Sequence, residues 1–266
     1  MNTLPMNCPS CQGNPKARRR GLTLIEVLVV MAVIFILAML LLPGLANRGP
    51  RRPYAARCLS NMKQLQICWE LYADDYKGTL VRNEPSDPAS WVTGSMKTKM
   101  GATNLADITN GLLFAYGSLP ADYKCPSAKG PTPSGLDGSL LVRTVSMTPR
   151  MGNYSDKYRL IAPAPPVLKM PDITNPAPAN AAVFVDESVA TVGDGFFAMD
   201  NVAKQMAFRN SPTLRHRGIG TVSFADGHVS RWTFPSETNE PFPRTVLPFQ
   251  TNDWRQVYDS IYPPPP

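Results

Sequence analysis

An unbroken apolar run near the start of the chain constrains its fold more than any other feature. Residues 22–42 read LTLIEVLVVMAVIFILAMLLL and contain one charged side chain, Glu26. As a helix rising 1.5 Å per residue, this run is about 30 Å long, which matches the hydrocarbon thickness of a bilayer. It is also longer than the core of a secretory signal peptide, about 7–15 residues. We therefore predict a membrane-spanning helix over residues 22–45.

Much of the positive charge of the chain precedes this run. The formal net charge is +7. The first 20 residues contain no Asp or Glu, and removing their cations leaves +3; these cations are Lys16, Arg18, Arg19 and Arg20. A nucleic-acid partner is therefore not favoured. Cations before an apolar span orient the N-terminus toward the cytoplasm, so the remaining domain is expected in the periplasm.

Two residues distinguish this segment from a plain signal anchor. Gly21 separates the basic leader from the apolar run, and Glu26 lies inside the run. A carboxylate within a span costs about 2.5–3.5 kcal/mol on insertion scales, so it needs a partner. A free amine created at Leu22 would supply one, because the amine of a neighbouring subunit can pair with Glu26. The simpler alternative is an uncleaved anchor whose Glu26 reaches back to the membrane surface.

The segment resembles the prepilin cleavage and N-methylation motif of type IV pilins and type II secretion pseudopilins, in the residues Gly21-Leu22-Thr23-Leu24-Ile25-Glu26. The resemblance implies that a prepilin peptidase removes a leader of residues 1–21 and methylates Leu22. It implies no catalytic residue and assigns filament assembly to Glu26. The family usually has Phe at the first mature position, where this chain has Leu22.

A linker and an amphipathic helix are expected over residues 46–78. The segment from Pro43-Gly44 to Pro53 can kink or interrupt a helix, and the sequence leaves open whether the helix is continuous there. The amphipathic helix is predicted by an apolar stripe with steps of three and four residues, formed by Cys58, Met62, Leu65, Trp69, Tyr72 and Tyr76. Gly78 suits its C-cap. Cys58, Cys68 and Cys125 are expected to be small buried apolar residues, since Cys58 and Cys68 are about 15 Å apart on a helix, too far for a disulfide.

The rest of the chain predicts an α+β fold of the pilin-like kind. We expect a β-rich periplasmic domain over residues 79–262 with an antiparallel sheet and long loops, then a disordered tail at 263–266. Residues 181–186 read as a strand. Residues 221–224 and 228–232 read as a hairpin whose turn is Asp226-Gly227.

His216, nine further residues and Asp226-Gly227 resemble the H-x9-DG motif of a pilin-like subfamily from planctomycetes and verrucomicrobia. That subfamily is also similar in the post-anchor helix and in three blocks, YKCPS at 123–127, RTVSM at 143–147 and VFVDES at 183–188. The resemblance associates the motif with prepilin-type proteins and with no enzymatic role.

Metal binding is a weaker interpretation of the same region. The residue types of His216, Asp226 and His228 suit zinc. Calcium would prefer carboxylate oxygens, and the chain offers them at Asp186, Glu187, Asp194 and Asp226. The favoured interpretation is a hairpin in which His216 hydrogen-bonds the backbone or Asp226 and fixes a loop, with no cofactor. A lone C-x-x-C at Cys8 and Cys11 is half a zinc site.

The sequence therefore predicts a structural filament subunit rather than an enzyme. No G-x-S-x-G nucleophile elbow occurs, and only two histidines could act as bases. The expected partners are a prepilin peptidase, other pilin-like subunits and the inner membrane. The main alternative is a membrane-tethered periplasmic module that binds DNA, a glycan or a secreted substrate.

Overall fold

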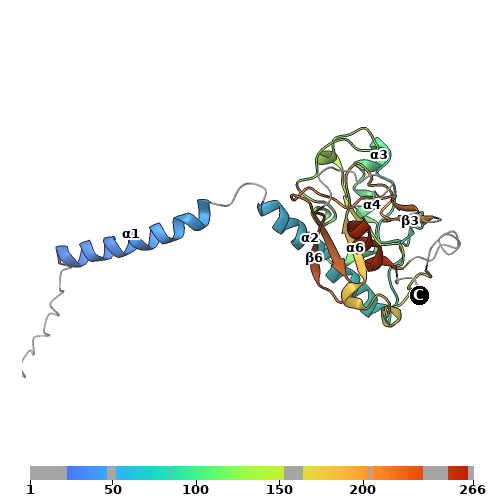
Figure 1. Ribbon diagram of the computed structural model, residues 1–266, viewed down its shortest axis with the longest axis horizontal. Coiled ribbons are helices and arrows are strands. Elements are labelled where there is room, and N and C mark those ends of the chain that lie inside the picture. The colour runs from blue at the N-terminus through green and yellow to red at the C-terminus, as the bar shows by residue number, and fades with distance from the viewer. Residues whose placement is uncertain are drawn as a thin grey trace, which may run out of the picture. The chain divides into compact units, whose positions relative to one another are not determined.

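A computed structural model describes residues 23–46, 52–84, 86–152, 164–202, 205–235 and 251–262. The chain divides into two units with their own internal contacts, residues 1–49 and 50–266. The elements of both units are labelled in Figure 1. The predicted leader 1–21, the processing position Leu22 and the tail 263–266 lie outside the described residues.

The described part of the first unit is helix α1, Leu24–Ala46. It continues through Pro43-Gly44, where the sequence left open whether the helix is continuous. A proline removes one helical hydrogen bond, and this can kink a helix without ending it. Nowhere in the described part of the chain is a helix both long and apolar enough to cross a membrane. The membrane-spanning role of residues 22–45 stays a prediction.

The second unit begins with helix α2, Arg52–Asp75, which confirms the predicted amphipathic helix. The first five residues of its predicted stripe are buried, namely Cys58, Met62, Leu65, Trp69 and Tyr72. Tyr76 is 52% exposed because the helix has ended before it. Gly78, with a φ of 81°, donates from its backbone N–H to the carbonyl of Ala73 at 2.7 Å, which is the predicted glycine C-cap.

An antiparallel sheet forms the centre of this unit. In the described residues its strand order is β1-β2-β5-β6, with bounds β1 Val145–Met147, β2 Ala182–Asp186, β5 Ile219–Phe224 and β6 Val229–Thr233. Strands β5 and β6 pair as the predicted hairpin, with Ile219 opposite Thr233 and Ser223 opposite Val229. Strand β2 confirms the strand predicted at 181–186.

Shorter elements lie before, between and after these strands. A second antiparallel pair consists of β3 Met199–Val202 and β4 Gln205–Phe208. The short α-helices are α3 Lys99–Ala102 and α4 Ala106–Thr109. The 3-10 helices are η1 Leu112–Tyr116, η2 Pro120–Tyr123, η3 Gly138–Leu140, η4 Met170–Asp172 and η5 Pro178–Asn180. Helix α6, Thr251–Ile261, was not predicted.

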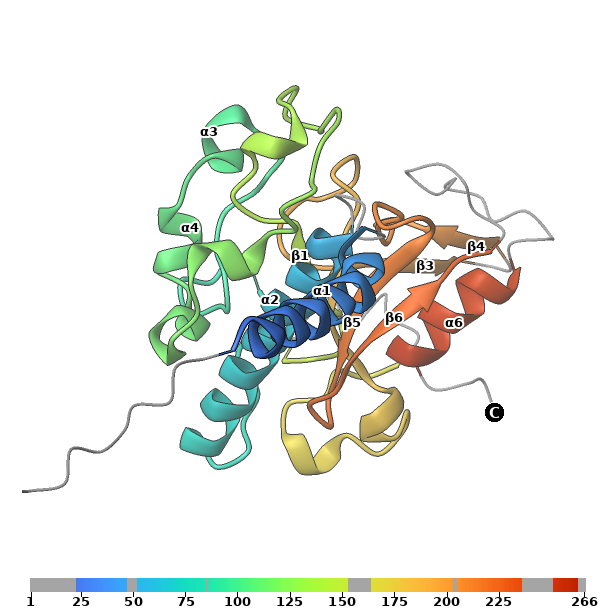
Figure 2. The ribbon, with the colours of Figure 1, turned by 90° about the vertical axis from the view of Figure 1, so that its left-hand side faces the viewer.

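Two apolar clusters hold the helices to the sheet. The first joins α2 to β2 and includes Leu65, Trp69 and Val183. The second joins α6 to β5 and β6 and includes Val222 and Trp232. Figure 2 shows β5 and β6 side by side, with α6 next to β6. Helix α2, the antiparallel sheet and the long loops together confirm the predicted α+β fold.

Candidate functional site

The N-terminal motif is described from Thr23 onward, where it forms a reciprocal helix cap. The backbone N–H and the hydroxyl of Thr23 each donate to Glu26 Oε2 at 2.8 Å. In return, the backbone N–H of Glu26 donates to Thr23 Oγ1 at 3.4 Å. This is a capping box, and it explains why α1 begins at Leu24. Both bonds to Glu26 end on Oε2, so the cap does not require Oε1.

The hairpin turn of the H-x9-DG motif lies at the predicted place, but its loop has three residues rather than two, because the Phe224 N–H donates to the His228 carbonyl at 3.0 Å. Gly227 has a φ of 92° and donates from its backbone N–H to the Phe224 carbonyl at 2.9 Å. The carbonyl of Gly227 accepts from Lys63 Nζ on α2 at 2.8 Å. A Cβ at this position would lie 2.6 Å from Glu70 Oε1. Gly227 therefore provides the turn conformation and also allows the turn to lie close against α2.

The structure separates the three residues considered for zinc. Asp226 and His228 form an exposed pair at the turn, with Oδ1 and Nδ1 2.5 Å apart. The hydrogen-bond contacts described for His216 are with Cys58 and Cys125. The expectation that His216 fixes this loop through the backbone or Asp226 is therefore wrong about the partner.

The carboxylates considered for calcium also have separate surroundings. Glu187 accepts from Ser146 Oγ and from Asn210 Nδ2, each at 2.6 Å. Asp194 accepts from the backbone N–H of Phe196 at 3.3 Å. Within the described residues, the group suited to a metal combines Asp186 with thiols and an imidazole, and not with these carboxylates.

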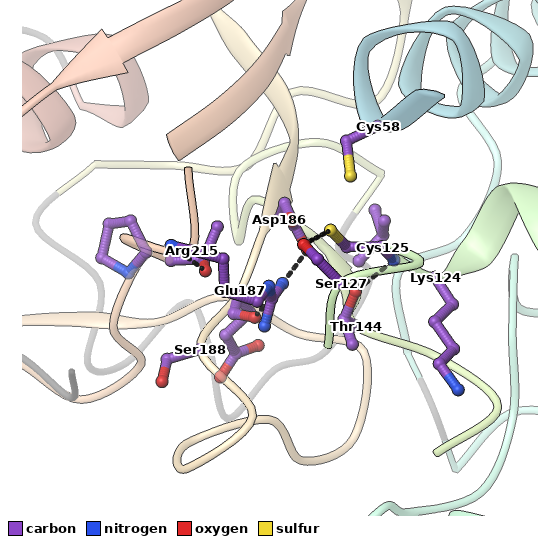
Figure 3. Close-up of polar contacts among 12 residues, drawn as sticks. Cys58, Lys124, Cys125, Ser127, Thr144, Asp186, Glu187, Ser188 and Arg215 are labelled. Carbon is purple, nitrogen blue, oxygen red and sulfur yellow. Dashed lines mark hydrogen bonds and ion pairs between the residues drawn. The ribbon is translucent and has the colours of Figure 1, made fainter. Parts of the chain in front are cut away.

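That group consists of Cys58, Cys125, Asp186 and His216. Their candidate ligand atoms all lie within 4.8 Å of one another. His216 Nε2 is 3.2 Å from Cys58 Sγ and 3.4 Å from Cys125 Sγ. All four residues are buried, with 8% exposure for His216 and less for the others. Figure 3 shows Cys58 extending from α2 toward Cys125, with Asp186 beside it.

Hydrogen bonds from residues outside the group fix the positions of Asp186 and Cys125. Asp186 Oδ1 accepts from Thr144 Oγ1 at 2.8 Å and from Arg215 Nη2 at 2.5 Å. The same Thr144 hydroxyl accepts from the backbone N–H of Cys125 at 2.9 Å. The other carboxylate oxygen, Asp186 Oδ2, is buried and has no hydrogen-bond partner among the described atoms. A buried oxygen of this kind is costly unless something binds it.

The surroundings shift the pKa values of the two thiols, Cys58 and Cys125, in opposite directions. Contact with Cys58 lowers the pKa of Cys125, and His216 adds to that effect against the opposing effect of burial. Contact with Cys125 raises the pKa of Cys58, and burial adds to it. Burial raises the pKa of Asp186 to about 7, although the Arg215 charge opposes this shift. The contact between the two thiols thus favours ionisation of Cys125 over ionisation of Cys58.

This group was missed by the sequence interpretation, which treated Cys58 and Cys125 as small apolar residues. Both are indeed buried and free. However, the four residues lie on four separate segments, and their spacing resembles no zinc motif. Only the fold brings them together. Cys68, by contrast, is buried on α2 outside the group and donates to the Tyr116 carbonyl at 3.5 Å.

A family model described as the prokaryotic N-terminal methylation motif matches residues 16–42 of the chain. The matched range includes Gly21, Leu22 and Glu26. The match supports a type IV pilin-like protein that is processed by a prepilin peptidase and associates with other pilin subunits. No curated protein and no solved structure matches the chain. The H-x9-DG subfamily stays a prediction from the sequence.

Proposed function

We propose that the chain is a structural pilin-like subunit that assembles into a type IV pilus or a type II secretion pseudopilus-like filament. The observation that carries this proposal is the methylation-motif match at residues 16–42. The proposed subunit is not an enzyme, and assembly needs no cofactor. Its apolar segment anchors the precursor in the inner membrane in a single pass, and the domain that follows lies in the periplasm.

Processing creates the group on which assembly depends. In this proposal the peptidase cuts after Gly21, where the absence of a side chain leaves the scissile bond unhindered. The cut exposes the amine of Leu22, which is then methylated and keeps its positive charge. The apolar segment leaves the bilayer and packs with the same segment of neighbouring subunits in the filament core.

The capping arrangement supports the role proposed for Glu26. Thr23 holds the Glu26 carboxylate at the first turn of α1 through Oε2. A helix N-terminus favours a negative charge. The carboxylate thus lies close in sequence to the new N-terminus, and Oε1 is not used by the cap. We assign this oxygen to the amine of a neighbouring Leu22, a pairing that sets the axial register of subunits.

The test is recruitment into filaments. We expect the full-length protein, expressed in cells with a working filament-assembly system, to appear in the sheared surface fraction or in isolated pseudopili. In cells that process the protein but lack the assembly system, it should remain in the inner membrane. Equal retention in the membrane of both strains would contradict the proposal and favour the tethered binding module.

A further inference from the structure

We propose that Cys58, Cys125, Asp186 and His216 bind a zinc ion that fastens α2 to the sheet domain. Cys58 comes from α2, Cys125 follows η2, Asp186 ends β2 and His216 precedes β5. Positions as far apart as 58 and 216 thus supply ligands to one point. The site is independent of the N-terminal motif that carries the proposed function.

The spacing of the ligand atoms suits a tetrahedral ion. Bonds of about 2.0–2.3 Å to nitrogen, oxygen and sulfur place the ligands of a tetrahedral zinc about 3.3–3.8 Å from one another. His216 Nε2 lies 3.2 Å from one sulfur and 3.4 Å from the other. All four ligand atoms are within 4.8 Å of one another. Small side-chain movements are enough to bring them onto one ion.

The unpartnered oxygen of Asp186 is a second and independent indication. The side chain of Asp186 is 2% exposed, and Oδ2 has no hydrogen-bond partner among the described atoms. Thr144 and Arg215 hold the other oxygen and so fix the orientation of the carboxylate. In protein metal sites, residues that do not bind the metal usually orient the metal ligands through hydrogen bonds. Zinc would supply the partner that Oδ2 lacks.

The types of ligand atom in the group indicate which metal it would bind. Two thiolates and an imidazole favour zinc over magnesium or calcium, which prefer oxygen ligands. On binding, Cys58 and Cys125 are thiolates, so any proton they still hold is released. Two thiolates, one carboxylate and Zn²⁺ sum to a charge of −1, and the Arg215 guanidinium beside Asp186 offsets it. The net charge of the zinc, its ligands and Arg215 is therefore zero.

The burial of the group indicates a structural role for the ion. Four protein ligands complete the coordination of zinc, whereas a catalytic zinc keeps a position open. The four residues are at most 8% exposed, so a substrate has no access. In the periplasm, which is oxidising, coordination would also hold the two cysteines as thiolates rather than as a disulfide.

The test measures bound metal in the full-length chain. The protein is expressed with zinc in the medium, extracted in detergent and purified without chelator. Elemental analysis should find one zinc per chain. After removal of zinc, Co²⁺ titration should produce the intense thiolate-to-cobalt absorption of a tetrahedral site. Cys58→Ser and His216→Ala should each lower metal affinity by more than the 10–100-fold typical of losing an outer partner.

Matched controls exist within the chain. Cys68→Ser removes another buried thiol of α2, and His228→Ala removes the other histidine. Both variants should bind zinc like the wild type. Circular dichroism identifies any variant that fails to fold, and Asp186→Asn then provides a ligand change of nearly equal volume.

Three results would overturn the proposal. The first is a wild-type protein without zinc that also shows no thiolate-to-cobalt absorption. The second is equal metal binding by the wild type, Cys58→Ser and His216→Ala. The third is an intact mass two hydrogens below the reduced chain in the zinc-free protein as isolated, with a Cys58–Cys125 disulfide in the peptide map. In that case the thiols have lost two electrons and two protons to an oxidant, and the pair is a covalent crosslink.

Discussion

The Glu26 carboxylate belongs to an interaction within the chain and to one proposed between chains. Within the chain, it accepts from Thr23 and completes the cap of α1. In a filament, the same group would pair with the amine of a neighbouring Leu22. A glutamine satisfies a capping box as glutamate does, but it carries no charge. The two roles can therefore be separated at a single residue.

We expect Glu26→Gln to be cleaved like the wild type but to lose assembly, because it keeps the cap and removes the charge. Thr23→Ala is the matched control, since it weakens the cap by about 0.5–2 kcal/mol and keeps the charge. The control should still assemble. Comparison of the membrane and filament fractions by immunoblot measures both effects. Normal assembly of Glu26→Gln would limit Glu26 to helix capping.

At the scale of elements, the β5–β6 hairpin is held to α2 at its turn. Lys63 of α2 donates to the Gly227 carbonyl. Glu70 Oε1 lies 2.6 Å from the position that a Cβ of residue 227 would occupy, and it accepts from Gln66 Nε2 at 3.1 Å. A side chain at 227 would therefore strain the turn and also displace a hydrogen-bonded carboxylate.

Gly227→Ala should lower the free energy of unfolding by about 1–2 kcal/mol from its left-handed backbone alone, with a further loss from the contact with Glu70. Gly117→Ala isolates the backbone effect. Gly117 has the same φ of 92°, and among the described residues, its chain neighbours apart, no atom lies within 4 Å of the position that a Cβ would occupy there. Urea denaturation of both variants gives the difference. An equal loss in the two would mean that Glu70 moves aside without cost.

At the scale of the whole molecule, elements with a clear local period could be predicted from the sequence. The stripe from Cys58 to Tyr72 identified α2, and Asp226-Gly227 between two apolar segments identified the hairpin. Helix α6 was missed although Trp254, Val257, Tyr258 and Ile261 follow helical spacing and are buried. The helical spacing was present in the sequence, but the sequence interpretation included these residues in the β-rich domain without assigning them a helix.

The buried group of Cys58, Cys125, Asp186 and His216 could not be predicted in the same way. Its members are separated by 30 residues or more along the chain. No local period or spacing links them, and each alone has an ordinary interpretation. Their proximity depends on how α2 and the loop after η2 pack against β2. This packing is a property of the tertiary structure, and it cannot be read from a single sequence.

The central claim is that the chain is processed as a prepilin, and the N-terminus of the protein in the membrane tests it most directly. N-terminal sequencing and intact mass are measured on full-length protein expressed with and without an active prepilin peptidase. The account predicts a chain that starts at Leu22, with a methylated amine, only when the peptidase is active. A chain that still begins at Met1 in both samples would contradict it and reduce the motif to an uncleaved anchor.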